Sequence, residues 1–268
     1  MAAVDRTGLR HSLRTVLRGV FSIGVFLAAW GVVAWSGIVP TDYFPSPFEV
    51  AVALIEEIRR GELPRALGMT FLRAVAGLTA AITLALAVAS VTARYSGARL
   101  TFDPVAEFLR PLPPAAIVPL AIFFLGLGWK LYAFILIMAC FWPIYLNASQ
   151  GLAAVPTVQI ETARSLGYTP WETLRDVRLP AAMPTIFVGI HQSSAIALIA
   201  AVATEMIAGR DGLGFYLMDA GMSLRVPETF AGLVMAMAAG IAINAIVVSL
   251  RRRVIRWHDT MTRMAAAT

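Results

Sequence analysis

Long apolar segments alternate with shorter polar segments along most of the chain. An α-helix needs roughly 20 apolar residues to cross the hydrocarbon core of a bilayer. Six segments approach that length, and the third of them is both the shortest and rich in proline. The pattern predicts an all-α, polytopic membrane protein with about six transmembrane helices. The predicted spans are residues 17–36, 70–93, 111–127, 131–150, 183–208 and 230–250.

The composition leads to the same conclusion. Of the 268 residues, 59% are hydrophobic and only 14% are charged, and the mean hydropathy is +0.74. A soluble domain carries about 25% charged residues, so this chain has too few polar side chains to cover a globule in water. Neither an internal repeat nor a polar linker divides the sequence. We therefore expect a single transmembrane domain over residues 1–268, with lipid as its main solvent.

The positive charges fall on alternate polar segments. Both ends of the chain, the segment after the second span and the long loop after the fourth hold 15 of the 22 Lys and Arg residues. Because Lys and Arg gather on cytoplasmic loops, both termini and the long loop are predicted to face the cytoplasm. The basic balance is thus a topology signal, and it argues against binding of nucleic acid. The N-terminus also resembles a signal peptide, but five later spans favour an uncleaved first span.

The polar segment after the first span, on the predicted external side, has local structure of its own. Ser46, Pro47 and Glu49 form a helix-capping box, and Gly61 ends the predicted helix. We expect an external amphipathic helix packed on the bundle, or one that contacts a delivery protein. Its predicted apolar stripe is Phe48, Ala51, Val52, Ile55 and Ile58, and its predicted wet face is Glu56, Glu57, Arg59 and Arg60.

The proline-rich segment 110–114 precedes the third span. Proline breaks helical hydrogen bonding, and such breaks are tolerated where a neighbouring helix or a cavity satisfies the freed groups. The segment is either a simple turn or a bend that forms part of a gate, and the residues alone leave both open.

The long polar loop, residues 151–184, is predicted to contain two short helices. The first begins at Pro156 and ends at Gly167, which favours a left-handed conformation. A second capping box over Thr169–Glu172 starts the next helix, which the pair Leu179-Pro180 is expected to end. A helix of this kind either rests on the lipid surface or serves as a stiff handle for a soluble partner.

One motif in this loop decides between the two. The loop reads Glu161-Thr162-Ala163, three residues, Gly167, nine residues and then Val177-Arg178-Leu179-Pro180. This resembles the signature loop of the permease subunits of binding-protein-dependent ABC importers, although that family usually has Ala where this chain has Thr162. Further segments resemble the branch that includes nitrate, taurine, aliphatic sulfonate and bicarbonate permeases. They are Pro45-Ser46-Pro47, residues 110–114, Ala203-Thr204-Glu205-Met206 and Gly212-Leu213-Gly214.

The resemblance implies a type I importer permease fold in the bacterial cytoplasmic (inner) membrane. It implies a second permease copy, with a homodimer expected, above two ATPase subunits, and an external solute-binding protein. The loop would dock into the ATPase through residues 157–178, and the solute would be a small oxyanion. The expected ATPase-coupling residues are Glu161, Ala163, Arg164, Gly167, Trp171, Glu172, Leu174, Leu179 and Pro180.

No feature of the sequence predicts chemistry on a substrate. A phosphate-binding P-loop needs Lys followed by Ser or Thr, but the sole lysine, Lys130, precedes Leu131. The histidines are far apart and Cys140 is the only cysteine, so no catalytic or metal site is expected. The chain is therefore predicted not to be an enzyme and to hold no cofactor, with ATP and Mg²⁺ bound by the partner ATPase.

The fifth span is the best candidate for the translocation path because it follows the loop and carries small and polar residues. Such residues indicate either close helix packing or a hydrated path. We expect Glu205 to bond nearby backbone or Arg210, His191 to be a packing residue, and Arg73 to extend from its span to water. The candidate path residues are His191, Gln192, Ser193, Ser194, Thr204 and Glu205.

Two other classes of protein remain as alternatives. An ion-coupled carrier acting without an ATPase would usually show several ionisable groups within its spans, and here Glu205 and His191 are the main ones. A membrane-embedded enzyme would have to use the same two residues.

Overall fold

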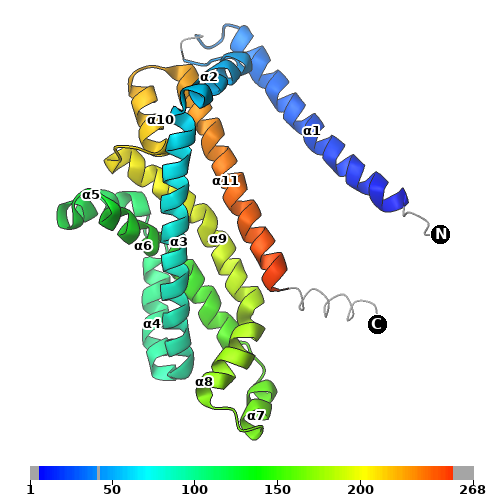
Figure 1. Cartoon of the computed structure of the whole chain (residues 1–268), viewed down its shortest axis with the longest axis vertical. Helices are drawn as coiled ribbons and strands as arrows, with labels where there is room; N and C mark the ends of the chain where they lie inside the picture. Colours follow the sequence, from blue (N-terminus) through cyan, green and yellow to red (C-terminus); the bar gives the residue numbers. More distant parts are fainter. Residues whose placement is uncertain (1–5, 41–42, 256–268) are drawn as a thin grey trace.

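The computed structural model describes residues 6–40 and 43–255, and within these ranges every regular element is helical (Figure 1). The all-α prediction is therefore confirmed. The elements are α1 (Arg6–Trp35), α2 (Pro47–Arg60), α3 (Glu62–Arg94), α4 (Ser96–Leu109), α5 (Pro114–Leu125), α6 (Trp129–Ala153), α7 (Thr157–Ser165), α8 (Pro170–Glu172), the π-helix η1 (Thr173–Arg178), α9 (Leu179–Ala208), α10 (Leu213–Met222) and α11 (Val226–Val254).

Four of the predicted spans are long, apolar, continuous helices in the described residues. They are α3, α6, the continuous helix Pro170–Ala208 that contains α9, and α11. The predicted span 17–36 corresponds to α1, whose apolar part is Phe21–Trp35. The predicted span 111–127 is not a straight helix. It is the second arm of a pair, Gly97–Leu109 and Pro114–Leu125, bent by 102°.

The bend follows from the sequence Arg110-Pro111-Leu112-Pro113-Pro114. Three prolines within four residues remove the amide donors that a continuous helix would need there. After the break, α5 has only 12 residues, or about 18 Å at 1.5 Å per residue. That length is too short to cross a core of about 30 Å alone.

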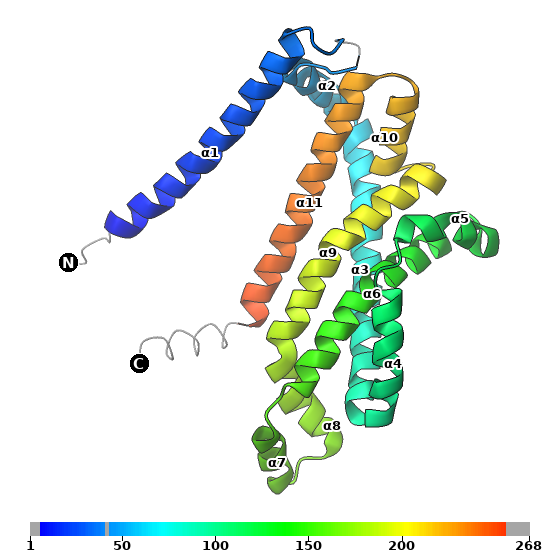
Figure 2. The same ribbon diagram turned by 180° about the vertical axis from the view of Figure 1, so that it is seen from behind.

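Helix α6 occupies the centre of the bundle, between α3 and α9 (Figures 1 and 2). Glycines permit this close approach. A Cβ added at Gly189 on α9 would lie 2.8 Å from the carbonyl oxygen of Pro143 and 3.0 Å from Cα of Ile144, both on α6. A Cβ at Gly77 on α3 would overlap the side chain of Leu136. Small residues therefore bring the backbones of α9 and α6 together and let Leu136 of α6 pack against the backbone of α3, as is usual where lipid supplies no hydrophobic driving force.

Helix α1 diverges from the rest of the bundle, and Figures 1 and 2 show it running away from α11. Its contact with the bundle is an aromatic cluster at one end. Trp30 Nε1 donates a hydrogen bond to the carbonyl oxygen of Pro45 (3.0 Å), and the Trp30 ring packs on Phe44 and Phe230. Most of the described apolar side chains of α1 are exposed, which fits contact with lipid or with another subunit.

The predicted cap of α2 is confirmed, but its predicted apolar stripe does not pack on the bundle, and one residue of its predicted wet face, Glu57, is buried. The Ser46–Glu49 capping box forms, and Gly61 has φ +81°. However, Phe48 is 76% exposed, and its neighbours on the apolar stripe also face outward. The buried residues are Val50, Ala53 and Glu57. In a membrane protein the outward direction includes lipid, so an apolar stripe need not face the protein core.

Candidate functional site

The predicted coupling loop, which the structure places at residues 154–178, lies at one end of the bundle, opposite the end that carries α2 and α10 (Figure 1). It is shorter than the predicted 151–184 because α6 continues to Ala153 and α9 begins at Leu179. Between them, α7 and the helix that begins with α8 project beyond the bundle (Figure 2). This end of the molecule therefore offers a compact helical projection.

The first helix of the loop ends as the sequence predicts. Gly167 adopts φ +83°, in the left-handed region. Its amide donates to the carbonyl of Arg164 (3.0 Å), and the amide of Tyr168 donates to that of Ala163 (3.1 Å). This pair of bonds is a Schellman motif, which satisfies the last carbonyls of α7. Gly167 therefore fixes the reversal between the two helices of the loop.

The second helix begins as predicted but does not end as predicted. The Thr169 hydroxyl accepts from the amide of Glu172 (3.3 Å), while the Glu172 carboxylate accepts from the amide of Thr169 (2.7 Å). Leu179-Pro180 was expected to end this helix, yet the chain stays helical through η1 into α9. Pro180 has no amide to donate, and the amide of Leu179 bonds the carbonyl of Leu174, five residues back. The proline thus accompanies a π-turn, and the loop is joined to α9 without a break.

Arg178, at the end of this π-turn, ties the loop to two other helices. Its Nη1 donates to the carbonyl of Ala93 at the end of α3 (3.2 Å), and its Nη2 donates to that of Leu152 at the end of α6 (3.0 Å). These carbonyls belong to the last turns of their helices, where partners within the helix are lacking. Burial lowers the pKa of Arg178, and the nearby positive charge of Arg164 lowers it further. One side chain therefore holds together the ends of α3 and α6 and the start of α9.

The predicted coupling residues divide into two groups. Glu161, Arg164, Trp171 and Glu172 are exposed, with Trp171 65% exposed. Ala163 is buried, Leu174 and Leu179 pack partly buried against the main core, and Gly167 shapes the turn. Pro180 lies in the first turn of α9. The exposed group is available to a partner, and the second group holds the loop in place.

Several predicted path residues bond to backbone. Ser193 Oγ on α9 donates to the carbonyl of Cys140 on α6 (2.9 Å), and Cys140 Sγ lies 3.5 Å from the carbonyl of Ser193. The hydroxyls of Ser194 and Thr204 bond carbonyls of their own helix, those of His191 and Ala200. In these contacts the three hydroxyls bond to helix backbone. A role of Ser193, Ser194 and Thr204 in the translocation path stays a prediction.

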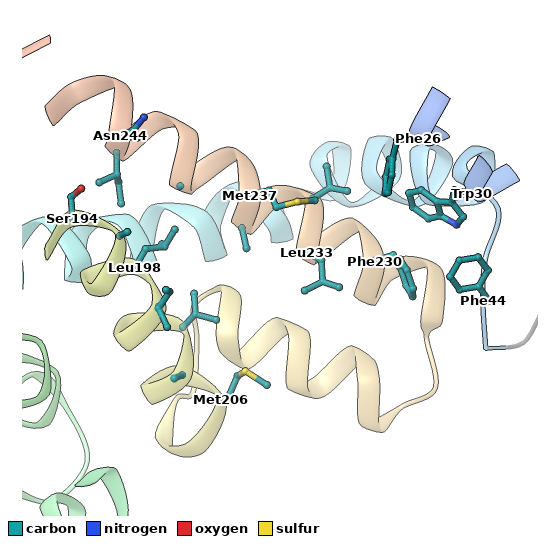
Figure 3. Close-up of a pocket in the computed structure, with 18 of the residues that line it drawn as sticks. Phe26, Trp30, Phe44, Ser194, Leu198, Met206, Phe230, Leu233, Met237 and Asn244 are labelled. Carbon is teal, nitrogen blue, oxygen red and sulfur yellow. The ribbon is translucent and has the colours of Figure 1, made fainter. Parts of the chain in front are cut away.

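Two cavities border α9, and Ile199 and Ala203 line both of them. The first, of about 770 Å³, lies where the 110–114 bend meets α6 and α9. Gln192 lines it together with Glu107, Arg110 and Ala200. The second, of about 1150 Å³, is almost wholly apolar and lies between α1, α9 and α11 (Figure 3). Of the predicted path residues, His191 and Ser194 line this second cavity.

His191 and Asn244 form a polar contact at one end of the apolar cavity. Nε2 of His191 on α9 lies 2.7 Å from Oδ1 of Asn244 on α11. The sequence showed no partner for His191, because the two residues lie on different spans. This bond joins α9 to α11, and the packing role of His191 stays a prediction.

Glu205 lies in a buried polar network at the end of the bundle opposite the coupling loop. Its carboxylate accepts from Arg73 Nη1 (2.7 Å), the Thr70 hydroxyl (2.7 Å) and the amide of Gly214 (3.0 Å). Arg73 also pairs with Asp211 and lies 4.1 Å from the centre of the Tyr132 ring. The network joins α3, α9 and the start of α10.

This network corrects one sequence prediction and part of another. Arg73 was expected to extend to water, but it is buried and paired. Glu205 was expected to bond nearby backbone or Arg210. It does accept from the nearby backbone amide of Gly214, but its charged partner is Arg73 on α3. A signal was present in the sequence: opposite charges stand near corresponding ends of two apolar segments, and unpaired charges are costly there.

Within the part of the chain that the structure describes, no three His, Cys, Asp or Glu residues lie together in a way that could hold a metal ion.

Comparisons with known proteins agree with the architecture. Residues 77–258 match the family described as binding-protein-dependent transport system inner membrane component. The chain is 28% identical to the putative aliphatic sulfonates transport permease SsuC of Bacillus subtilis, covering 91% of this chain and 88% of that one. It is 28% identical to the taurine permease TauC of Escherichia coli (91% of each chain) and 26% identical to the bicarbonate permease CmpB of Synechococcus elongatus (92% of each).

Solved structures show the same fold. A chain of the MetNI methionine ABC transporter in an inward-facing conformation matches with a TM-score of 0.62 at 20% identity, covering 74% of this chain and 98% of that one. A chain of an amino acid ABC transporter matches with a TM-score of 0.60 at 18% identity, covering 75% and 98%. The architecture is that of an ABC importer permease, and this chain belongs to the family of inner membrane components of binding-protein-dependent transport systems.

Proposed function

We propose that this chain is the permease subunit of an ATP-driven importer for a small oxyanion, and that it couples to ATPase subunits through the helices of residues 157–178. Two copies of the chain would form the path, and two ATPases would bind the coupling loops. An external solute-binding protein would deliver the solute. ATP and Mg²⁺ would be bound by the ATPases, and both termini of this chain would face the cytoplasm.

The observation that carries this proposal is the attachment of the coupling loop. Its exposed surface includes Trp171 and Leu166, which give a partner apolar area to bind. The same loop is continuous with α9 and is bonded by Arg178 to the ends of α3 and α6. A push on the projection would therefore move three helices as a rigid body, as a two-state transport cycle requires.

The substrate class is supported by the relatives and by one cavity. The relatives are named for aliphatic sulfonates, taurine and bicarbonate, all small solutes with an oxygen-bearing acidic group. The cavity at the proline bend is lined by Arg110 and Gln192, whose side chains donate hydrogen bonds to an oxyanion, and also by the acidic Glu107. Selection among these solutes would rest mainly with the solute-binding protein.

A substitution in the exposed part of the loop tests the coupling. Trp171→Ala should lower co-purification of the ATPase at least tenfold, because a buried aromatic residue often dominates an interface. Trp35→Ala is the matched control, since Trp35 is 86% exposed on α1, away from the loop. Gly167→Pro and deletion of residues 169–178 should abolish association while the chain stays in the membrane.

Wild-type recovery of the ATPase with the 169–178 deletion would contradict the proposed coupling. Transport by the purified chain alone in liposomes, driven by an ion gradient, would contradict the proposed function as a whole.

A further inference from the structure

A small pocket lies between the coupling loop and the end of α3. Its volume is about 210 Å³. Its walls come from the last turn of α3, from α7, and from the helix that starts at Pro170. The lining includes three guanidinium side chains and no carboxylate. The lining residues are Ala93, Arg94, Ile160, Arg164, Tyr168, Pro170, Thr173 and Arg178.

The positive charge of this pocket is not balanced by acidic side chains. Among the described residues, none of the ion pairs involves Arg94, Arg164 or Arg178. The C-terminal ends of α3 and α6 face Arg178, and each contributes roughly half a negative charge. Together they offset about one of the three positive charges. The remainder favours an anion.

The three arginines of this pocket also have hydrogen-bond donors that are not in use. Arg178 uses Nη1 and Nη2 on the two helix-end carbonyls, but its buried Nε has no partner among the described residues. The side chains of Arg94 and Arg164 are exposed at the pocket and make no hydrogen bond to the described residues, although Arg94 Cζ lies 5.4 Å from the centre of the Tyr95 ring. Arginine forks match the oxygens of a phosphate group in pairs. The pocket therefore has several free donors and room for a group of that size.

We propose that this pocket binds a phosphate-type oxyanion, either free in solution or carried on a lipid headgroup, through Arg94, Arg164 and Arg178. A bound oxyanion bridges α3 to α7, because Arg94 and Arg164 stand on those two helices. It thereby fixes the coupling loop against the end of α3. Regulation of transport by this oxyanion would rest on the proposed function. The binding of the oxyanion does not rest on it.

The first test uses the full chain in nanodiscs of phosphatidylcholine, with no ATPase present. Inorganic phosphate is titrated against chloride at constant ionic strength, so that general screening of charge is equal, and the melting temperature is followed. We expect a saturable rise at millimolar phosphate. Arg94→Gln with Arg164→Gln should weaken the apparent affinity at least tenfold. Arg175→Gln, the control, should leave it unchanged, since Arg175 is 72% exposed in the same segment and lies outside the pocket.

A second test separates the two sources of phosphate. The wild type and the same variants are purified from membranes, and retained phosphatidylglycerol is measured by native mass spectrometry. Retention in the wild type and in Arg175→Gln, with loss in the double variant, identifies the headgroup as the occupant. A phosphate-specific rise in melting temperature without such retention identifies the free ion. If the double variant does not fold, the single variant Arg94→Gln serves for both comparisons.

The proposal is overturned if phosphate and chloride act alike and lipid retention is equal in the wild type and the variants. Because both measurements use the isolated chain, that result would leave the ATPase coupling untouched. Conversely, failure of the ATPase to bind the loop would leave a positive phosphate result standing.

Discussion

Arg73 on α3 donates a hydrogen bond from Nη1 to Oε1 of Glu205 on α9 over 2.7 Å, although 132 residues separate the two in the sequence. Both side chains are buried. The Thr70 hydroxyl accepts from the amide of Leu213 (2.8 Å) and donates to Glu205 (2.7 Å), so the network also positions the start of α10. A buried ion pair of this kind is costly to break from one side only.

Removal of one partner should therefore destabilise the protein more than removal of both. Arg73→Met leaves the buried Glu205 carboxylate without its counterion, at a cost of about 3–5 kcal/mol. Glu205→Leu should cost less, because Arg73 keeps its ion pair with Asp211. The double variant should recover at least half of the loss seen in Arg73→Met. The wild type, the two single variants and the double variant form a double-mutant cycle. Thermal unfolding of each purified chain in the same detergent measures their stabilities. Equal stability of a single variant and the wild type would show that the pair does not hold α3 to α9.

Gly212 and Gly214 enclose the Glu205 side chain. A Cβ at Gly212 would overlap the Glu205 carboxylate, and Gly212 has φ +95°. A Cβ at Gly214 would lie 2.7 Å from Cβ of Glu205. Gly212→Ala should cost about 1–3 kcal/mol through overpacking and backbone strain, measured by the same thermal unfolding. Gly68→Ala on α3 is the control, because a Cβ there meets nothing within 4 Å. Equal melting temperatures for both variants would refute the steric argument.

The contact between α9 and α6 gives a separate prediction. Gly189→Ala places a methyl group 2.9 Å from Cβ of Asn147 and 2.8 Å from the carbonyl oxygen of Pro143. The two helices must separate, so we expect a loss of about 1–3 kcal/mol in detergent unfolding. Gly240→Ala on α11 should have little effect, because its added Cβ makes an ordinary contact of 3.4 Å with Leu198. A tolerated Gly189→Ala would mean that this interface can relax.

Arg178 should matter for transmission of movement more than for binding of the partner. Arg178→Gln removes the charged donors to Ala93 and Leu152, so the loop loses its attachment to α3 and α6. In an assembled transporter we expect the ATPase to bind, but transport per ATP hydrolysed to fall several-fold. Arg175→Gln supplies the comparison. If Arg178→Gln lost ATPase binding, but the complexes that still formed transported normally per ATP hydrolysed, Arg178 would be assigned to docking instead.

The capping box at Thr169 and Glu172 gives a prediction on pH. Hydrogen bonds from the hydroxyl and the backbone amide of Thr169 lower the pKa of Glu172 below its ordinary value of 4.5. A lowered carboxyl pKa contributes stability that is present above 4.5 and is lost as the pH falls through the lower, folded-state pKa. Hydrogen exchange of the amides of Thr169, Glu172 and Thr173 should therefore be protected at neutral pH and lose protection only below 4.5, after correction for the intrinsic rate.

Thr169→Ala removes the cap directly, and should cost the helix about 1 kcal/mol and abolish this protection at neutral pH. Thr101→Ala on α4 is a control, since the Thr101 hydroxyl bonds only a carbonyl of its own helix. Unchanged protection in Thr169→Ala would show that packing alone holds the second helix of the loop.

Local signals in the sequence predicted much of the helical structure because they act over a few residues. Both capping boxes, the left-handed Gly167 and the proline break at 110–114 are decided by neighbours in the chain. The same local reasoning was wrong at Leu179-Pro180. Proline was expected to end a helix, but tertiary contacts, including those of Arg178, hold the chain in a π-turn that continues into α9.

The faces of helices were harder to predict, because in lipid an apolar side chain gains nothing by choosing the protein over the membrane. Phe48 illustrates this, since it lies on the predicted apolar stripe of α2 but faces outward. Glu57, predicted on the wet face, is only 1% exposed. The hydroxyls of the fifth span were equally ambiguous until their carbonyl partners were known.

The amino-acid sequence alone determined that the chain is an all-α membrane protein with a loop motif of a recognisable family, because hydropathy and a motif are properties of the linear chain. Only the tertiary structure decided the pairing of Arg73 with Glu205, the attachment of Arg178 to two helix ends and the cluster of three arginines around one pocket. Each of these depends on the distance between residues on different helices. Many arrangements of the same helices satisfy the sequence pattern, and the packing of small residues selects one of them.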